Sequence, residues 1–134
     1  MIDIRFDHHQ AILEIEVYDR YETADLGKRL EAYLEMARHH PQFYVLETVH
    51  KGWGNWIAIS TGMNEHLEEA GVEAEEFARL MKRLKKYAIV SDRKIVAGLY
   101  SLILRVSGTK SKVFSFSEQY NARLWLAGQY LAES

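Results

Sequence analysis

Residues 87–92 read Tyr87-Ala88-Ile89-Val90-Ser91-Asp92, an almost unbroken apolar run that ends in two polar residues. A short apolar run closed by polar residues is typical of a strand buried inside a sheet. Residues 95–106 follow with a helical pattern, and residues 112–116 predict another strand. A strand, a helix and a strand in this order indicate a parallel pair joined by a crossover helix.

The N-terminal residues predict an antiparallel hairpin. Residues 2–7 and 11–18 each alternate between apolar and polar side chains, as strands with one apolar face do. The polar link between them is short enough for a hairpin. A helix is expected next, with Thr23 as its N-cap and its end near His40, because Pro41 disfavours helical geometry in the residue before it.

The remaining segments alternate between strand and helix. Residues 43–49 are rich in β-branched and aromatic side chains and predict an inner strand. Residues 57–84 have a helical pattern interrupted by Gly62 and Gly71, which predicts two helical pieces, and residues 117–131 predict the final helix. The expected fold class is therefore α/β: a mixed, mostly parallel β-sheet with an N-terminal hairpin and crossover helices.

Length and composition predict a single domain over residues 1–134. The chain is 48% hydrophobic and 27% charged, close to the average of globular proteins, and it has no linker-like segment. The 17 basic and 19 acidic residues give a formal net charge of -2, so no nucleic-acid partner is expected. The N-terminus does not read as a signal peptide and no apolar run approaches the ~20 residues of a spanning helix, so the expected location is cytoplasmic.

The sequence predicts no catalytic residue, no metal site and no cofactor. The absence of cysteine excludes disulfides, thiolate ligands and a thiol nucleophile. Neither a Gly-x-Ser-x-Gly motif nor a glycine-rich phosphate loop is present. The histidine pairs at 8–9 and 39–40 are adjacent in sequence, where side chains diverge instead of meeting on one ion. A distant alternative is a hydrolase-type enzyme that uses His50 with a carboxylate such as Glu47.

Two predicted strand ends carry the candidate ligand-binding residues, because parallel strands place ligands at their carboxyl ends. These candidates are Lys51, Trp53, Trp56, Ser91, Asp92 and Arg93. Cations and helix N-termini favour an anion, and tryptophan rings offer flat apolar walls, so a small anionic or amphipathic ligand is expected. In the alternative interpretation the tryptophans close the core, and Ser91 or Asp92 merely caps the next helix.

The predicted helix at 95–106 is apolar on more than one face, which exceeds what a surface helix needs. Either it is deeply buried, or its outer face meets a second subunit or the interfacial zone of a membrane. The candidate interface residues are Ile95, Leu99, Leu102 and Ile103. The flanking cations, which suit anionic lipid headgroups, are Arg93, Lys94, Arg105, Lys110 and Lys112. A homodimeric interaction module without a small ligand is therefore the alternative function.

The chain resembles the SpoIIAA-like family over nearly its whole length. The similarity is carried by residues 87–92, by Val113-Phe114-Ser115-Phe116 and by Ala122-Arg123-Leu124-Trp125-Leu126, which match in order and spacing. The first half agrees through the opening hairpin, with Leu13-Glu14-Ile15, and through the acidic start of the next helix. The resemblance implies a STAS-type α/β domain, as found in anti-anti-sigma factors and in the cytoplasmic tails of anion transporters.

The resemblance also implies a regulatory role without catalysis. In the anti-sigma-factor antagonists, a Ser following an Asp at the start of the helix after the third strand is phosphorylated by the partner kinase. Residues 47–57 contain no Asp-Ser pair, and Ser60 and Thr61 lie further along the chain. Membrane association and binding of a small apolar or anionic ligand have been proposed for SpoIIAA-like proteins. The expected function is thus that of a non-enzymatic domain that binds a ligand or a protein partner, with membrane association as a further expectation.

Overall fold

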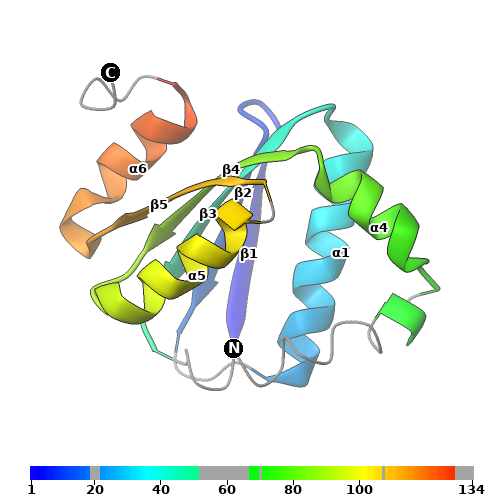
Figure 1. Cartoon of the computed structure of the whole chain (residues 1–134), viewed down its shortest axis with the longest axis horizontal. Coiled ribbons are helices and arrows are strands. Elements are labelled where there is room, and N and C mark those ends of the chain that lie inside the picture. The colour runs from blue at the N-terminus through cyan, green and yellow to red at the C-terminus, as the bar shows by residue number, and fades with distance from the viewer. Residues whose placement is uncertain (19–21, 52–66, 70, 107, 129–134) are drawn as a thin grey trace.

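One β-sheet forms the centre of the computed structural model (Figure 1). The structure describes residues 1–18, 22–51, 67–69, 71–106 and 108–128. Within these ranges five strands pair in the order β1-β2-β3-β4-β5. They are β1 (Ile2–Asp7), β2 (Ile12–Val17), β3 (Phe43–Val49), β4 (Leu84–Val90) and β5 (Lys110–Phe114). β1 and β2 are antiparallel and the later neighbours are parallel, which confirms the predicted mixed, mostly parallel α/β fold.

Helices cover both faces of the sheet. The described helices are α1 (Thr23–His39), α4 (Ala74–Met81), α5 (Lys94–Val106), the short 3-10 helix η1 (Phe116–Glu118) and α6 (Gln119–Leu126). α1, α4 and α5 pack on one face, whereas α6 packs on the other (Figure 1). Because α1 joins β2 to β3 and α5 joins β4 to β5, both act as crossovers between parallel strands. In the described part of the chain, no helix combines the length and apolar character needed to cross a membrane.

Alternate residues of β4 explain why both faces are covered. Tyr87 and Ile89 belong to the core under α1 and α5, whereas Ala88 and Val90 belong to the core under α6. All four side chains are buried. A strand that is apolar on both faces must be covered twice, as is usual in parallel sheets. β4 accordingly lies inside the sheet, between β3 and β5.

The boundary between α4 and β4 lies earlier than predicted. β4 begins at Leu84 instead of residue 87, and α4 ends at Met81 instead of residue 84. The Arg83 N–H donates to the Leu80 carbonyl at 3.1 Å, so the chain turns directly after the helix. Leu84 is buried and pairs with Phe43 of β3, which favours the strand.

β5 is displaced toward the N-terminus, covering Lys110–Phe114 instead of residues 112–116. The reason is the cap of the following helix. The Ser115 N–H donates to the Glu118 carboxylate at 2.9 Å, and the Ser115 hydroxyl donates to it at 2.8 Å. The bond from the Ser115 backbone, and then that from its side chain, lower the pKa of Glu118. Ser115 therefore starts η1 and cannot extend the strand.

Two predicted helix ends are also wrong. α6 ends at Leu126 instead of residue 131, and Gly128 has a φ of +74°, the left-handed conformation that commonly closes helices. α1 has Glu22 instead of Thr23 as its N-cap. The Glu22 N–H donates to the Asp25 carboxylate at 2.7 Å. An acidic side chain three residues into the helix thus satisfies a backbone donor at its start.

Two isoleucines provide a matched test of this packing. Ile89 in β4 is fully buried, whereas Ile95 in α5 is 84% exposed. We expect Ile89→Ala to lower the free energy of unfolding by about 2–5 kcal/mol, because it leaves a cavity in the core. Ile95→Ala should change it by no more than about 0.5 kcal/mol. Urea unfolding followed by circular dichroism measures both, and equal losses would contradict the described packing.

Candidate functional site

The carboxyl ends of the parallel strands meet at one edge of the sheet. Thr48 of β3 pairs with Val90 of β4, and Val90 pairs with Phe114 of β5. His50 and Lys51 therefore leave β3 at the same edge at which Ser91 and Asp92 leave β4. We call this edge, defined by residues 50–51, 91–93 and 115–116, the carboxyl rim.

Ser91 and Asp92 hold the carboxyl rim together. Ser91 is fully buried; its N–H donates to the Phe114 carbonyl at 2.9 Å, and its hydroxyl oxygen accepts the Arg93 N–H at 3.2 Å. Asp92 is exposed, and its carboxylate accepts the Phe116 N–H at 3.1 Å. Asp92 thus binds the first residue of η1 through a hydrogen bond, while Ser91 lies beside the first turn of α5. Neither is the N-cap of α5, because the helix begins at Lys94 and its first backbone bond runs from the Ala97 N–H to the Arg93 carbonyl at 3.0 Å.

The cationic candidates at the carboxyl rim face solvent. Arg93 and Lys51 are both exposed, and the Lys51 N–H donates to the Tyr18 carbonyl at 2.8 Å. Their side chains are placed where an anion approaching the strand ends would meet them. Trp53 and Trp56, as well as Ser60 and Thr61, lie outside the described residues.

His50 does not pair with Glu47, which was its predicted carboxylate. Its Nε2 lies 2.9 Å from the Glu16 carboxylate of β2, and its ring stacks on Tyr18 with ring centroids 5.5 Å apart. Glu47 instead points toward α1, where it binds Arg29. The alternation of side chains along β3 separates the two residues, so the predicted pairing is wrong.

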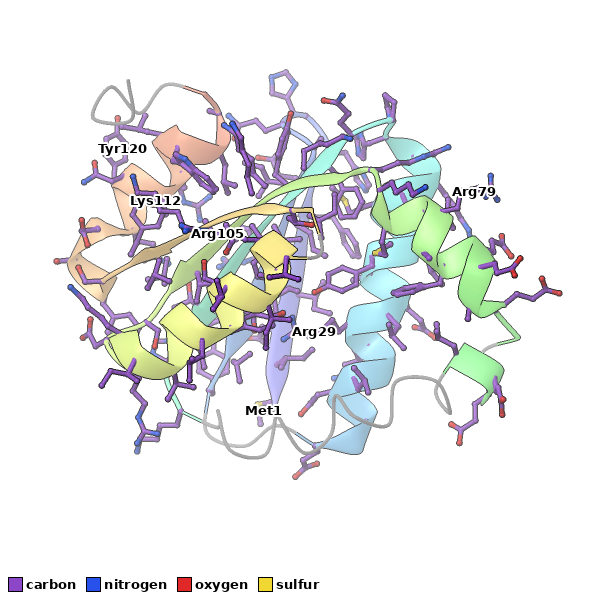
Figure 2. All side chains as sticks on the ribbon, in the orientation of Figure 1. Met1, Arg29, Arg79, Arg105, Lys112 and Tyr120 are labelled. Atoms are coloured by element: carbon purple, nitrogen blue, oxygen red, sulfur yellow. The ribbon has the colours of Figure 1, made fainter. Side chains whose placement is uncertain are left out.

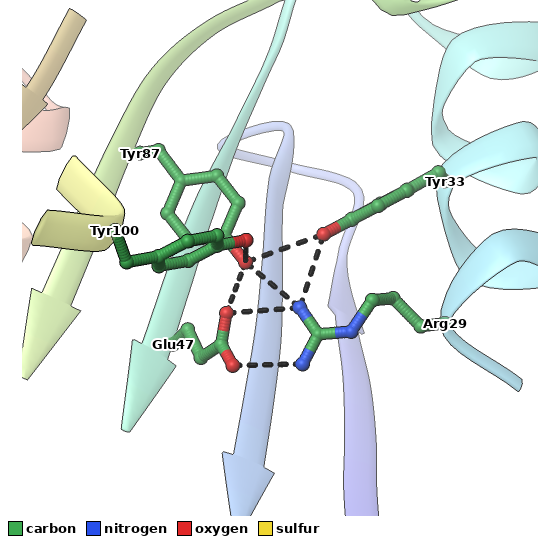
Figure 3. A network of polar contacts seen from close by, with 5 residues as sticks. All are labelled: Arg29, Tyr33, Glu47, Tyr87 and Tyr100. Atoms are coloured by element: carbon green, nitrogen blue, oxygen red, sulfur yellow. Dashed lines mark hydrogen bonds and ion pairs between the residues drawn. The ribbon is translucent and has the colours of Figure 1, made fainter. Parts of the chain in front are cut away.

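A buried polar network lies between the sheet and the helices on the α1 face (Figure 3). Arg29 of α1 and Glu47 of β3 form a bidentate ion pair, with Nη1 to Oε1 at 2.9 Å and Nη2 to Oε2 at 2.7 Å. Both side chains are only 1% exposed. Arg29 Nη1 also donates to the hydroxyls of Tyr33 at 3.1 Å and Tyr87 at 2.8 Å. Tyr87 donates to Glu47, and Tyr100 of α5 donates to Tyr87 at 3.3 Å.

The network keeps Arg29 charged and Tyr87 and Tyr100 neutral. Burial is the largest single influence on the Arg29 guanidinium and would lower its pKa, but the Glu47 carboxylate, Tyr33 and Tyr87 together outweigh it and raise that pKa well above its ordinary value. Burial, followed by the nearby Glu47 charge, raises the pKa of Tyr87 well above its ordinary value. Burial, followed by the Tyr33 hydroxyl, does the same for Tyr100. The guanidinium stays charged and the phenols stay neutral at physiological pH, so this cluster is suited to holding elements together and not to proton transfer.

No local pattern in the sequence indicates this network directly. Arg29 lies among apolar positions of α1, next to Leu30, and Glu47 lies in a strand whose other residues are largely apolar. Both charged residues lie at positions where apolar neighbours predict burial. Because charged side chains are rarely buried unless paired, this is the signal from which the Arg29–Glu47 pair could have been predicted.

The outer face of α5 is exposed and apolar, which settles the alternatives left by its sequence against complete burial. The exposed residues on this face, with their exposed fractions, are Ile95 84%, Leu99 61%, Leu102 56%, Ile103 62% and Val106 82%. The inner face is buried through Ala97, Tyr100 and Ser101. The helix is thus apolar on two opposite sides, of which the sheet covers one.

Cations lie near both ends of α5, and the helix itself carries no carboxylate, although the exposed Asp92 directly precedes it. The sequence of α5, KIVAGLYSLILRV, has no acidic residue. Lys94 and Arg93 are exposed at its first turn. Arg105 lies at its last turn, where its Nε and Nη2 donate to the Ser111 carbonyl at 3.0 and 2.8 Å. Lys112 of β5 (Figure 2), predicted as a flanking cation, does not belong to this face. It pairs with Ala88 of the core under α6, and its Nζ lies 5.7 Å from the centre of the Phe114 ring.

The hairpin turn contacts the end of α1 through histidines. His8 Nδ1 lies 2.8 Å from His40 Nε2, with the rings inclined by only 22°. Burial, followed by the neighbouring His8 and His39, lowers the pKa of His40. Across the residues that the structure describes, no group of three or more His, Cys, Asp or Glu side chains is arranged to hold a metal ion.

Comparison with known proteins gives one informative result. The model of the SpoIIAA-like family matches residues 12–127, from the start of β2 to the end of α6. The match includes both strand ends of the carboxyl rim, the whole of α5 and the buried polar network. Searches of the curated proteins and of the solved structures give no match.

The Arg29–Glu47 pair can be tested by removing one or both charges. Glu47→Leu and Arg29→Met should each lower the free energy of unfolding by about 3–5 kcal/mol, because each leaves one uncompensated buried charge. The double variant Arg29→Met/Glu47→Leu should lose less than either single variant, since no buried charge remains. Urea unfolding of the four proteins gives the coupling energy. Additive losses in the double variant would show that the two charges do not stabilise each other.

Proposed function

The chain belongs to the SpoIIAA-like family, and from this premise we propose that it is a non-enzymatic regulatory domain that works by binding a partner through the outer face of α5. Family membership supports a STAS-type interaction domain in general terms. The observation that carries the specific proposal is the exposed apolar face of α5. Soluble proteins seldom leave a contiguous apolar surface on a helix whose other side already packs in the core.

The chemistry around this face favours an anionic, amphipathic partner. The helix is 13 residues long, or about 20 Å, and has cations near both ends and no carboxylate. We propose that the partner is the interfacial zone of an anionic membrane, reached from the cytoplasm. A helix of this kind lies in the plane of the interface with its apolar face among the acyl chains. Leu99 and Ile103, near the middle of the face, would insert, while Lys94 and Arg105 would meet headgroups.

Co-sedimentation with lipid vesicles tests this proposal. We expect the wild-type chain to bind vesicles that contain phosphatidylserine, with little binding to pure phosphatidylcholine and weaker binding at high salt. Leu99→Glu/Ile103→Glu should abolish binding, because it places charges where acyl chains must be met. Lys94→Glu should weaken it roughly tenfold or more, given about 1 kcal/mol per cation near an anionic surface.

The matched control is Tyr120→Glu. Tyr120 is 72% exposed and lies on α6 (Figure 2), which packs on the opposite face of the sheet from α5. Like each of the two substitutions in the α5 variant, this change places one negative charge at an exposed position, so it should leave vesicle binding unchanged. Equal loss of binding in this control, or no binding by the wild-type chain, would refute the membrane proposal. The remaining proposal would then be that α5 binds an apolar surface of a protein partner.

A second candidate function has its own support at the carboxyl rim. Ser91, Asp92 and Arg93 lie at the end of β4, beside Lys51 at the end of β3, and the last two are exposed cations. We propose that a small anionic or amphipathic ligand binds there, with Trp53 and Trp56 as predicted neighbours.

Tryptophan fluorescence tests the small-ligand proposal. Trp125 is one of three tryptophans, is 1% exposed and belongs to the core under α6. Its emission is therefore a constant background, and Trp125→Phe leaves only the emission of Trp53 and Trp56. In this variant, a fatty acid or a nucleotide added at rising concentration should change the emission in a saturable manner. Arg93→Gln should weaken that response, whereas Arg79→Gln, on α4, should not. If no probe gives a saturable change, no small ligand binds beside these tryptophans.

A further inference from the structure

Among the strands that the structure describes, β2 alone pairs with β1, so the outer edge of β1 is open, with α1 beside it (Figure 1). The Tyr18 N–H donates to the Met1 carbonyl at 3.2 Å, which fixes the alternation of hydrogen bonds between β1 and β2. Asp3 and Arg5 direct their backbone groups toward β2, so Ile2, Ile4 and Phe6 direct theirs outward. Such an edge is a ready template for one more strand.

The open edge is bordered by a groove that is partly apolar. The groove has a volume of about 520 Å³ and lies between β1 and α1. Its β1 side is formed by Ile2, Ile4 and Phe6, of which Phe6 is 43% exposed. Its α1 side carries Lys28, Glu31 and Glu35. A strand added to this edge would therefore cover apolar side chains as well as backbone groups.

We propose that the occupant of this edge is β1 of a second copy of the chain, paired antiparallel about a two-fold axis at Ile4. The sequence of β1, IDIRFD, is complementary to itself in this register. Ile4 lies opposite Ile4 of the second copy, Asp3 opposite its Arg5, and Ile2 opposite its Phe6. Each of the first five residues of β1 is thereby matched by an apolar partner or by an opposite charge.

The backbone geometry agrees with this register. Residues 2, 4 and 6 direct N–H and C=O outward, so Ile4–Ile4 and Ile2–Phe6 become the hydrogen-bonded pairs. Asp3 and Arg5 then fall at a non-hydrogen-bonded pair, where side chains approach most closely and opposite charges stabilise. Within one chain, Asp3 accepts the Tyr18 hydroxyl at 3.0 Å and Arg5 lies 3.9 Å from Glu16, and both side chains remain near the solvent-exposed edge.

The charges of the groove fit the same symmetry. The two copies of α1 would run antiparallel across the axis. The Lys28 end of one groove then faces the Glu35 end of the other, which brings opposite charges together at the two ends, whereas the two copies of Glu31 lie nearest the axis. The dimer is thus favoured mainly by the pairing of the strands.

The symmetry has a consequence for α5. Residues paired across the axis point to the same face of the extended sheet, so both copies of α1 and α5 lie on one side of it. The two exposed faces of α5 then approach a flat surface together. Two linked weak contacts bind such a surface far more tightly than one.

Sedimentation equilibrium of the whole chain tests the dimer. We expect the wild-type chain to dimerise at micromolar concentrations. Arg5→Asp places like charges opposite Asp3 at two symmetric positions and should weaken self-association by about tenfold or more. The charge-swapped variant Asp3→Arg/Arg5→Asp restores opposite charges and should regain dimerisation. Thermal unfolding of each variant shows whether the hairpin still folds.

Disulfide trapping tests the register, since the wild-type chain has no cysteine. In an oxidised mixture of Asp3→Cys and Arg5→Cys chains, mixed dimers should dominate over same-variant dimers. Mixing Arg5→Cys with Asp7→Cys reports the alternative register centred on Phe6 and should give little product.

Three results would overturn the proposal. They are a wild-type monomer at high micromolar concentration, a dimer unaffected by Arg5→Asp but lost in Leu99→Glu/Ile103→Glu, and trapping that favours residues 5 and 7. None of these concerns vesicle binding by a single chain, so the dimer and the membrane proposal stand or fall separately.

Discussion

The ion pair between Arg29 and Glu47 is the contact on which the arrangement of the α1 face depends. Both charges lie where water does not reach, and each is expensive to bury alone. Their partners come from α1, β3, β4 and, through Tyr100, α5. Since removing either partner of the ion pair leaves a buried charge in an apolar core, α1 is held in one position against β3, and the Tyr100 hydroxyl adds a contact from α5.

The fixed position of α5 explains why its other side is available. Tyr100 and Ala97 pack one face of the helix against the sheet. Because the other apolar residues lie on the opposite face, they cannot reach the core of their own chain. Their exposure is therefore a property of the fold and not of a loosely packed helix. A binding role follows naturally from such a surface, whereas the buried network has no group accessible to a substrate.

Several surfaces of the molecule are connected through the same sheet. The carboxyl rim includes Arg93, and α5 begins at the next residue, Lys94. A ligand at the rim and a partner on α5 would therefore bind next to each other. The outer edge of β1 lies at the opposite end of the strand order from β5, which α5 contacts. Self-association through β1 consequently leaves both α5 and the carboxyl rim uncovered. Binding and dimerisation can therefore operate together.

Within the described residues, the sequence alone determined the strand and helix order, the antiparallel hairpin and the parallel inner strands, because periodicity and the Pro41 breaker are local signals; most of the helical piece predicted from residue 57 lies outside those residues. It also located the carboxyl ends of β3 and β4 and the apolar excess of α5. It misplaced boundaries such as Leu84 and Ser115, where burial and a side-chain cap outweigh local propensity. Only the tertiary structure decided that Glu47 meets Arg29 instead of His50, and that the second apolar face of α5 is exposed. These outcomes depend on which residues distant in sequence share one face of the sheet, and no spacing within a single segment specifies that.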